Sequence, residues 1–212
     1  MNPRLAIVLV VAGAMSLAAI VFASVGLSRE PEPAGVAGPA ARVDLPAESR
    51  RFEGALKPDG LRAPDFELRD QDGEPLRMRD LRGGPVIVTF LYTRCDDTCP
   101  PQAQQIKGAL DRLDADVPVI AVSVKPSEDT PATARHFLAE QGMAGRMDFA
   151  LGTQEELEPV WKGYAIQPQS PTTEHHAVIA LIDKRGMQRV GFPLNYATPR
   201  GIAHDVRVLA GE

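Results

Sequence analysis

The sequence predicts an α/β fold in which a central mixed sheet is flanked by helices and preceded by an N-terminal transmembrane helix. Two observations predict the sheet: apolar runs typical of buried strands alternate with segments of helical spacing, and helix start signals stand at the head of those segments. Strands that alternate with helices of about 10–14 residues indicate a largely parallel sheet. A third observation predicts the membrane segment, because no residue from Leu5 to Ser28 is charged.

The uncharged run of residues 5–28 is long enough to span a bilayer. At about 1.5 Å per residue it makes a helix of roughly 35 Å, and a hydrocarbon core is about 30 Å thick. Arg4 precedes the run, so we expect a single-pass protein of the inner membrane with the rest of the chain on the extracytoplasmic, periplasmic side. A cleavable signal peptide is the alternative, because residues 21–23 (Val-Phe-Ala) resemble a cleavage site.

The next segment differs in composition and divides the chain into three parts. Prolines are scattered among Ala, Gly and charged residues up to Pro58, without helical or strand periodicity. Such a segment is typical of a semi-extended tether. We therefore expect an anchor or signal peptide at residues 1–28, a Pro/Ala-rich tether at residues 29–61 and one folded domain at residues 62–212.

The strands of the domain are predicted from hydrophobic runs and turn signals. Asp70-Gln71-Asp72-Gly73, between alternating apolar residues, predicts a hairpin. The continuous apolar run of residues 85–92 is typical of a central strand buried on both faces. Further strands are expected at residues 117–124, 149–151, 178–182 and 188–192, the last of them an edge strand.

Helices are expected between these strands. Thr130, Thr153 and Thr198 are predicted N-caps, and Glu156 completes a capping box with Thr153. A further helix is expected over residues 100–113, directly after the first buried strand. A hairpin in front of the sheet and an antiparallel pair at its end together predict a thioredoxin-like fold.

Composition and charge exclude several classes of protein. The chain has 212 residues, of which 44% are hydrophobic and 24% charged, so it is neither disordered, nor collagenous, nor a coiled coil. Its net charge is −5 and no run of Lys or Arg occurs, so no nucleic-acid partner is expected. Cys95 and Cys99 are the two cysteines of the chain, and their close spacing predicts a functional site rather than a disulfide scaffold.

Cys95 and Cys99 fall where the first buried strand passes into its helix. Ligands collect at the carboxyl ends of strands in open α/β sheets. In a helix that starts near Thr98, positions i and i+4 bring the two side chains within about 5–6 Å. The N–H groups of a helix N-terminus lower thiol pKa values, whereas Asp96 and Asp97 oppose that effect, so strong acidity of either thiol does not follow.

Three kinds of site fit this pair of cysteines. A structural disulfide is disfavoured, because closing so short a loop gains little entropy. A redox-active dithiol is the second kind. A soft-metal site is the third, because two thiolates on one face suit Cu(I) better than a hard cation. A third ligand is needed to separate the last two.

The four histidines are the candidates for that ligand. His136 and His204 fall within amphipathic helices and are expected to be solvated or to pack between helices. His175 and His176 precede the strand at residues 178–182, which is expected beside the strand that leads to Cys95. A histidine there would complete a trigonal Cys-Cys-His set, although adjacent histidines in a loop are often merely exposed.

Several motifs together resemble the Sco/SenC family. They are Pro64-Asp65-Phe66, Asp80-Leu81-Arg82-Gly83, the Cys-x-x-x-Cys-Pro element after Thr89-Phe90-Leu91-Tyr92-Thr93, Val122-Ser123-Val124, and Glu174-His175 before Ala180-Leu181-Ile182-Asp183. The resemblance covers about residues 62–209. Members are membrane-tethered thioredoxin-like proteins associated with copper delivery to the dinuclear copper centre of cytochrome c oxidase.

The resemblance implies that Cys95, Cys99 and His175 bind one copper ion per monomer. His175 is matched because it stands eight positions before Asp183, as the family histidine does. As partners, the resemblance implies the copper-centre subunit of cytochrome c oxidase or another copper acceptor, and a thioredoxin-like reductant. It also implies a metallochaperone rather than an enzyme.

The chain departs from the family pattern at four places. Asp96 and Thr98 replace the usual Pro and Val between the cysteines. Lys125 stands where the family usually has an Asp, which puts a cation near the site and would favour thiolate. His176 takes the place of a Ser or Thr, and the loop of residues 164–175 is short.

Copper uptake is expected to weaken as the pH falls, because the ligands must be deprotonated. Oxidation to a disulfide would remove both sulfur ligands, and transfer by ligand exchange needs an exposed site. The alternative function is a thiol–disulfide oxidoreductase or thiol peroxidase that uses Cys95 and Cys99 without stable metal binding. A peroxidase would need a cationic activator, for which Arg94 and Lys125 are candidates.

Overall fold

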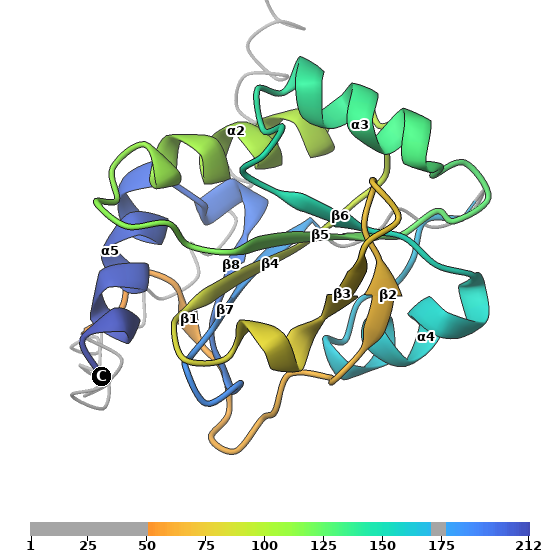
Figure 1. Cartoon of the computed structure of the whole chain (residues 1–212). Helices are drawn as coiled ribbons and strands as arrows, with labels where there is room; N and C mark the ends of the chain where they lie inside the picture. The colour runs from red at the N-terminus through yellow and green to blue at the C-terminus, as the bar shows by residue number, and fades with distance from the viewer. Residues whose placement is uncertain (1–50, 171–176) are drawn as a thin grey trace, which may run out of the picture. The chain divides into compact units, whose positions relative to one another are not determined.

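The computed structural model describes residues 51–170 and 177–212. They fold around a six-stranded mixed sheet with the strand order β1-β8-β7-β4-β5-β6 (Figure 1). Strands β4, β5 and β6 are parallel, and β7 runs antiparallel to both β4 and β8. The predicted thioredoxin-like α/β class with a mixed sheet is confirmed. The strands are β1 Ala55–Leu56, β4 Val86–Leu91, β5 Val119–Ser123, β6 Asp148–Ala150, β7 Val178–Ile182 and β8 Gln188–Pro193.

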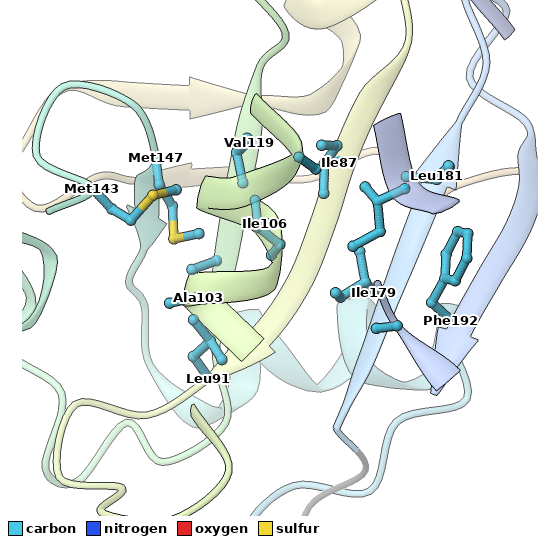
Figure 2. Packing of buried hydrophobic residues seen from close by; sticks show 14 of the residues in the cluster. Ile87, Leu91, Ala103, Ile106, Val119, Met143, Met147, Ile179, Leu181 and Phe192 are labelled. Atoms are coloured by element: carbon cyan, nitrogen blue, oxygen red, sulfur yellow. The ribbon is translucent and has the colours of Figure 1, made fainter. Parts of the chain in front are cut away.

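Side chains alternate between the two faces of the sheet, so each face has its own hydrophobic cluster. Ile87 and Leu91 of β4 belong to one cluster, and Val88 and Phe90 to the other. Figure 2 shows the first cluster, in which Ile106 of a covering helix faces the sheet. Helices α2 (Cys99–Leu110), α3 (Pro131–Glu140) and α5 (Pro199–Ala210) cover that face.

The other face is covered by helix α4 and by the predicted hairpin. The elements on this side are α4 (Gln154–Gly163), β2 (Glu67–Arg69), β3 (Pro75–Arg77) and the 3-10 turn η2 (Met78–Leu81). The hairpin forms a separate two-stranded sheet, in which Leu68 pairs with Leu76. Its turn needs a glycine, because Gly73 has a φ of +87°.

The helix starts follow the predicted capping signals. Thr130 and Thr153 each form a capping box, and Thr198 accepts a hydrogen bond from the Gly201 N–H. A short 3-10 turn, η3 (Leu194–Tyr196), lies between β8 and α5. These caps fix where α3, α4 and α5 begin.

The expected edge strand is wrong, because β8 is covered by β1. Ala55 pairs with Gly191 and Leu56 with Val190, both antiparallel. These residues lie in the range assigned to the tether, where they showed no strand periodicity. They are held by Asp205 of α5, which is fully buried and accepts hydrogen bonds from the N–H groups of residues 53 (2.8 Å) and 54 (2.9 Å).

No helix among the described residues is long and apolar enough to cross a membrane. The predicted membrane segment at residues 1–28 lies outside the described residues, as does most of the predicted tether.

Candidate metal centre

The two cysteines lie at the carboxyl end of β4, as predicted. Cys95 is in the turn that follows the strand, and Cys99 is the first residue of α2. Only 4% of Cys95 and none of Cys99 is exposed. The expectation of an exposed site is therefore wrong for both residues, because they pack in the same hydrophobic cluster as Leu91 and Ile106.

The N-terminus of α2 is built so that a single N–H faces the site. Its second and third residues are Pro100 and Pro101, which carry no N–H group. The remaining donor of this turn, the N–H of Cys99, is directed at the Sγ of Cys95, 3.2 Å away. The Thr98 side chain makes no capping hydrogen bond, so the Cys95 sulfur acts as the acceptor at this helix end.

The environment makes the two thiols very different. The pKa of Cys95 is lowered to about 6, first by the hydrogen bond from the Cys99 thiol and further by the Thr98 hydroxyl and the Cys99 N–H, against the opposing effect of burial. Asp97 accepts from the Cys95 thiol at 3.3 Å and opposes ionisation, as expected of a like charge. Burial, together with the neighbouring Cys95, raises the pKa of Cys99. Cys95 is thus acidic without help from a cation.

A buried carboxylate, Asp129, ties the turn after β4 to the end of β5. Its Oδ1 accepts from the N–H of Thr93 at 2.8 Å, and its Oδ2 accepts from the hydroxyl of Ser123 at 2.5 Å. Burial raises the pKa of Asp129, and these neutral donors only partly offset it. The sequence analysis did not single out Asp129; the signal was an acidic residue close after a buried strand, next to a helix start.

Lys125 is close to the site, and its side chain contacts Glu128 and the ring of Tyr92. Its Nζ lies 2.7 Å from Glu128 Oε1 and 5.3 Å from the centre of the Tyr92 ring. Burial and the adjacent Cys95 raise the pKa of Tyr92. Neither Lys125 nor Arg94 is among the main groups that lower the pKa of Cys95. The expected assistance from a Lys125 cation is therefore not what acidifies this thiol.

Gln102, one turn after Cys99, links α2 to the start of β7. Its Nε2 donates to the carbonyl oxygen of Val178 at 3.0 Å and to the hydroxyl of Thr89, while its Oε1 is buried and has no hydrogen-bond partner among the described residues. A glutamine on the buried face of an amphipathic helix was the signal that the sequence analysis missed. Val178 follows His175 by three positions, so Gln102 connects the two segments that carry the predicted ligands.

The two histidines that the structure describes lie on helices, as the sequence analysis expected. His136 is exposed and pairs with Glu140 on α3, and His204 pairs with the adjacent Asp205 on α5. His175 and His176 lie outside the described residues. The antiparallel register of Thr89 with Ile179 brings the chain into β7 at the end of the sheet where β4 delivers Cys95.

The donor atoms present suit a soft metal. Two sulfurs, one of them a thiolate near neutral pH, favour Cu(I) or another soft ion over a hard cation. Within residues 51–170 and 177–212, no group of three or more His, Cys, Asp or Glu side chains is placed to hold a metal ion. The described part of the site thus offers two ligands, and a third must come from elsewhere in the chain or from the solvent.

Known proteins share this sequence and architecture. The SCO1/SenC family model matches residues 56–211. The chain is 30% identical over 189 residues to the protein SenC of Rhodobacter capsulatus, covering 81% of this chain and 83% of that one. It is 31% identical over 98 residues to a SCO1 protein homolog of Bacillus subtilis, a match that spans 44% of this chain and about half (51%) of the relative.

A solved structure, that of Bradyrhizobium japonicum ScoI with copper bound, has the same fold. The match has a TM-score of 0.60 and 29% sequence identity, and it covers 69% of this chain and 98% of that one.

Proposed function

The chain belongs to the SCO1/SenC family of copper chaperones for cytochrome oxidase assembly, and we propose that it is a membrane-anchored copper-binding protein of the extracytoplasmic side. It binds one copper ion through Cys95, Cys99 and His175. It delivers that ion to the copper-centre subunit of cytochrome c oxidase, or keeps the cysteines of that centre reduced. A thioredoxin-like reductant keeps Cys95 and Cys99 reduced.

One observation carries the proposal: the cysteine pair is held at the N-terminus of α2 with its two thiols in different states. Cys95, with a pKa of about 6, is largely a thiolate at neutral pH and can capture copper first. Cys99 keeps its proton in the free protein, because burial raises its pKa, and releases it when the metal binds. The second sulfur thus joins only after the first has bound.

The same geometry makes the oxidation state of the pair a gate on loading. Oxidation joins the two sulfurs in a disulfide, passes two electrons to the oxidant and releases the Cys99 proton, because Cys95 is already a thiolate at neutral pH. Neither sulfur then has a thiolate to offer, so copper uptake stops. Reduction by a dithiol partner, which becomes a disulfide itself, returns the two electrons, and Cys99 regains its proton while Cys95 becomes a thiolate that can bind copper again.

Anaerobic titration of the reduced full chain in detergent, with a chromophoric Cu(I) chelator as competitor, tests the proposal. We expect one tightly bound equivalent. Cys95→Ser should weaken binding by more than about 100-fold, because losing even a group that supports a ligand costs about 10–100-fold. His175→Ala should weaken it as well. The matched control is His136→Ala, an exposed histidine paired with Glu140. Stoichiometric Cu(I) binding by Cys95→Ser would contradict the proposal.

The second candidate function, a thiol–disulfide oxidoreductase, is favoured by the same difference in pKa. The Cys95 thiolate would attack a protein disulfide and release one thiolate. The Cys99 thiol would then lose its proton and attack the Cys95 sulfur, which releases the second thiol and leaves the Cys95–Cys99 disulfide. His175→Ala separates the two functions, since it should reduce copper affinity and leave the rate of exchange with a small disulfide unchanged.

A further inference from the structure

A cluster of cations lies at the end of the sheet opposite to the cysteines. Val86 pairs with Ile182, and the N–H of Gly83 donates to the carbonyl of Lys184 at 3.0 Å, so the turn after β7 lies where β4 begins. Cys95 follows the other end of β4. The two features are therefore separated by the length of the strand, about 20 Å for six residues.

We name this cluster the basic end and define it by six side chains: Arg51, Lys57, Arg62, Lys184, Arg185 and Arg189. They line two adjoining surface hollows of about 430 and 410 Å³ that share Arg185 and Arg189. Three carboxylates accompany them in these hollows: Asp59, Asp183 and Glu212. The basic end thus carries an excess of positive charge on a chain whose net charge is −5.

At the basic end, the carboxylate Asp183 and its partner Arg189 are the least exposed charged side chains, whereas four of the six cations and Asp59 are exposed. Asp183 is only 3% exposed and Glu212 is 21% exposed, and both pair with Arg189. Arg185 is 71% exposed although it pairs with Asp183. Lys57, Arg62 and Lys184 form no ion pair with any described residue. The surface that faces the solvent is therefore cationic.

The chain enters the folded domain through this same surface. Arg51 pairs with Glu212 at 3.6 Å. The buried ring of Phe52 lies about 6 Å from the guanidinium groups of Arg51 (6.0 Å) and Arg189 (5.9 Å). Asp205 then holds the N–H groups of the next two residues. Residues 51–54, where the described chain begins, are thus held at the basic end. The uncharged run of residues 5–28 precedes them in the sequence.

We propose that the basic end docks on the anionic surface of a lipid bilayer. The inference rests on the membrane anchor of the proposed function, because the anchor would tether the domain to a bilayer through the chain that enters it at this end. Each Lys or Arg near such a surface strengthens binding about fivefold. Docking in this orientation turns the cysteine end away from the bilayer, where the soluble part of an acceptor protein can approach Cys95.

Amine labelling of the full chain in lipid nanodiscs tests the inference. The five lysines report on different surfaces, with Lys57 and Lys184 at the basic end and Lys125 at the cysteine end. We expect phosphatidylglycerol in the discs to lower the labelling of Lys57 and Lys184, relative to Lys125, about fivefold compared with phosphatidylcholine alone. High salt should reverse the protection, because it screens exposed charges.

Variants make the test specific to the basic end. Lys184→Gln with Arg185→Gln should weaken docking roughly 25-fold and restore the labelling of Lys57. The matched control, Arg94→Gln with Lys107→Gln, removes the same charge elsewhere and should leave Lys57 protected. Equal labelling in both kinds of disc, or protection that appears only when an acidic protein partner is added, overturns the inference. A chain that does not enter the discs contradicts the anchor instead, and the same labelling with added anionic vesicles then tests the docking surface alone.

Discussion

Two buried aspartates, one at each end of the sheet, show how differently the two ends treat charge. Asp129 at the cysteine end is bound by neutral donors, and burial raises its pKa. At the basic end, burial acts in the same direction on Asp183, but the N–H groups of Met187 and Arg185 and the Arg185 guanidinium outweigh it, so the pKa of Asp183 is lowered. Two backbone N–H groups, joined by a neighbouring guanidinium that the cysteine end lacks beside Asp129, outweigh burial at Asp183.

This comparison teaches why the cysteine end lacks cations close to its sulfurs. A guanidinium or ammonium in contact with Cys95 would stabilise the thiolate and also repel a copper cation. Hydrogen bonds from the Cys99 thiol, the Thr98 hydroxyl and the Cys99 N–H lower the pKa of Cys95 without that repulsion. The cysteine end thus gains a thiolate without a positive charge in contact with it.

The largest expected effect tests whether neutral donors are enough to acidify Cys95. With a pKa of about 6, Cys95 is mostly thiolate at pH 7, whereas Cys99, whose pKa is raised, is less than about 1% thiolate. We expect iodoacetamide to modify Cys95 more than about 90-fold faster than Cys99 in the metal-free reduced chain. The rate at Cys95 should rise with pH and level off above about pH 7. Mass spectrometry of the modified peptides measures both rates, and similar rates would contradict the asymmetry.

The next largest effect is a difference in stability between variants that remove the charge of each buried aspartate. Asp183→Asn should lower the free energy of unfolding by about 2 kcal/mol at pH 7, because hydrogen bonds to a charged group are worth about 1.5–3 kcal/mol. Since the pKa of Asp183 is lowered in the folded state, its contribution is present above the unfolded pKa and is lost as the pH falls through the folded one.

Asp129→Asn is the matched control for that variant. The pKa of Asp129 is raised, so its contribution has the opposite sign: it is present at low pH and is lost as the pH rises through the folded pKa. We therefore expect Asn at position 129 to cost less than about 1 kcal/mol at pH 7. Urea unfolding at several pH values measures both variants, and equal losses would break the comparison.

A smaller effect tests whether neutral hydrogen bonds also organise the cysteine end beyond the turn. Gln102→Leu removes the donor to Val178 at the start of β7 and should weaken Cu(I) binding about tenfold, as losses of groups that support a ligand do. Gln104→Leu, an exposed glutamine of the same helix, is the control and should leave binding unchanged. Competition with a chromophoric chelator measures both, and equal affinities would contradict a positioning role for Gln102.

The smallest effect concerns Lys125, the cation nearest to the site by sequence. Lys125 pairs with Glu128, and both side chains are about one-third exposed, so the pair should contribute less than about 1 kcal/mol to stability. Lys125→Gln should leave the pKa of Cys95, read from the pH dependence of alkylation, almost unchanged. A marked rise of that pKa would instead show that Lys125 is the cationic activator that a thiol peroxidase requires.

Local patterns predicted much of this architecture, because the relevant interactions are close in sequence. The N-cap at Thr130, the capping box at Thr153, the Asp-Gly hairpin and the buried strands depend on residues close in sequence. The position of Cys95 and Cys99 at a strand-to-helix turn followed from the same patterns. The family resemblance added the copper function, and His175 as a ligand remains a prediction.

Interactions between residues far apart in the sequence could not be predicted from local patterns. Strand β1 pairs with β8 through backbone hydrogen bonds and is held by Asp205, more than 140 residues later in the chain, so its sequence carries no strand signal. The roles of Asp129 and Gln102 likewise depend on segments that meet only after folding. The unequal acidity of the two cysteines arises from the hydrogen bonds of the Cys99 thiol, the Thr98 hydroxyl and the Cys99 N–H to Cys95 and from the burial of Cys99, none of which spacing alone specifies.

The covering of β8 by β1 has a consequence for cutting the protein into pieces. A fragment that begins at residue 62 would lack Phe52 and β1, and would leave the backbone of residues 189–191 without hydrogen-bond partners on that side. An unpaired edge of this kind is a template for strand addition between molecules. Such a fragment would tend to self-associate, whereas one that starts before Phe52 would keep β1 paired with β8.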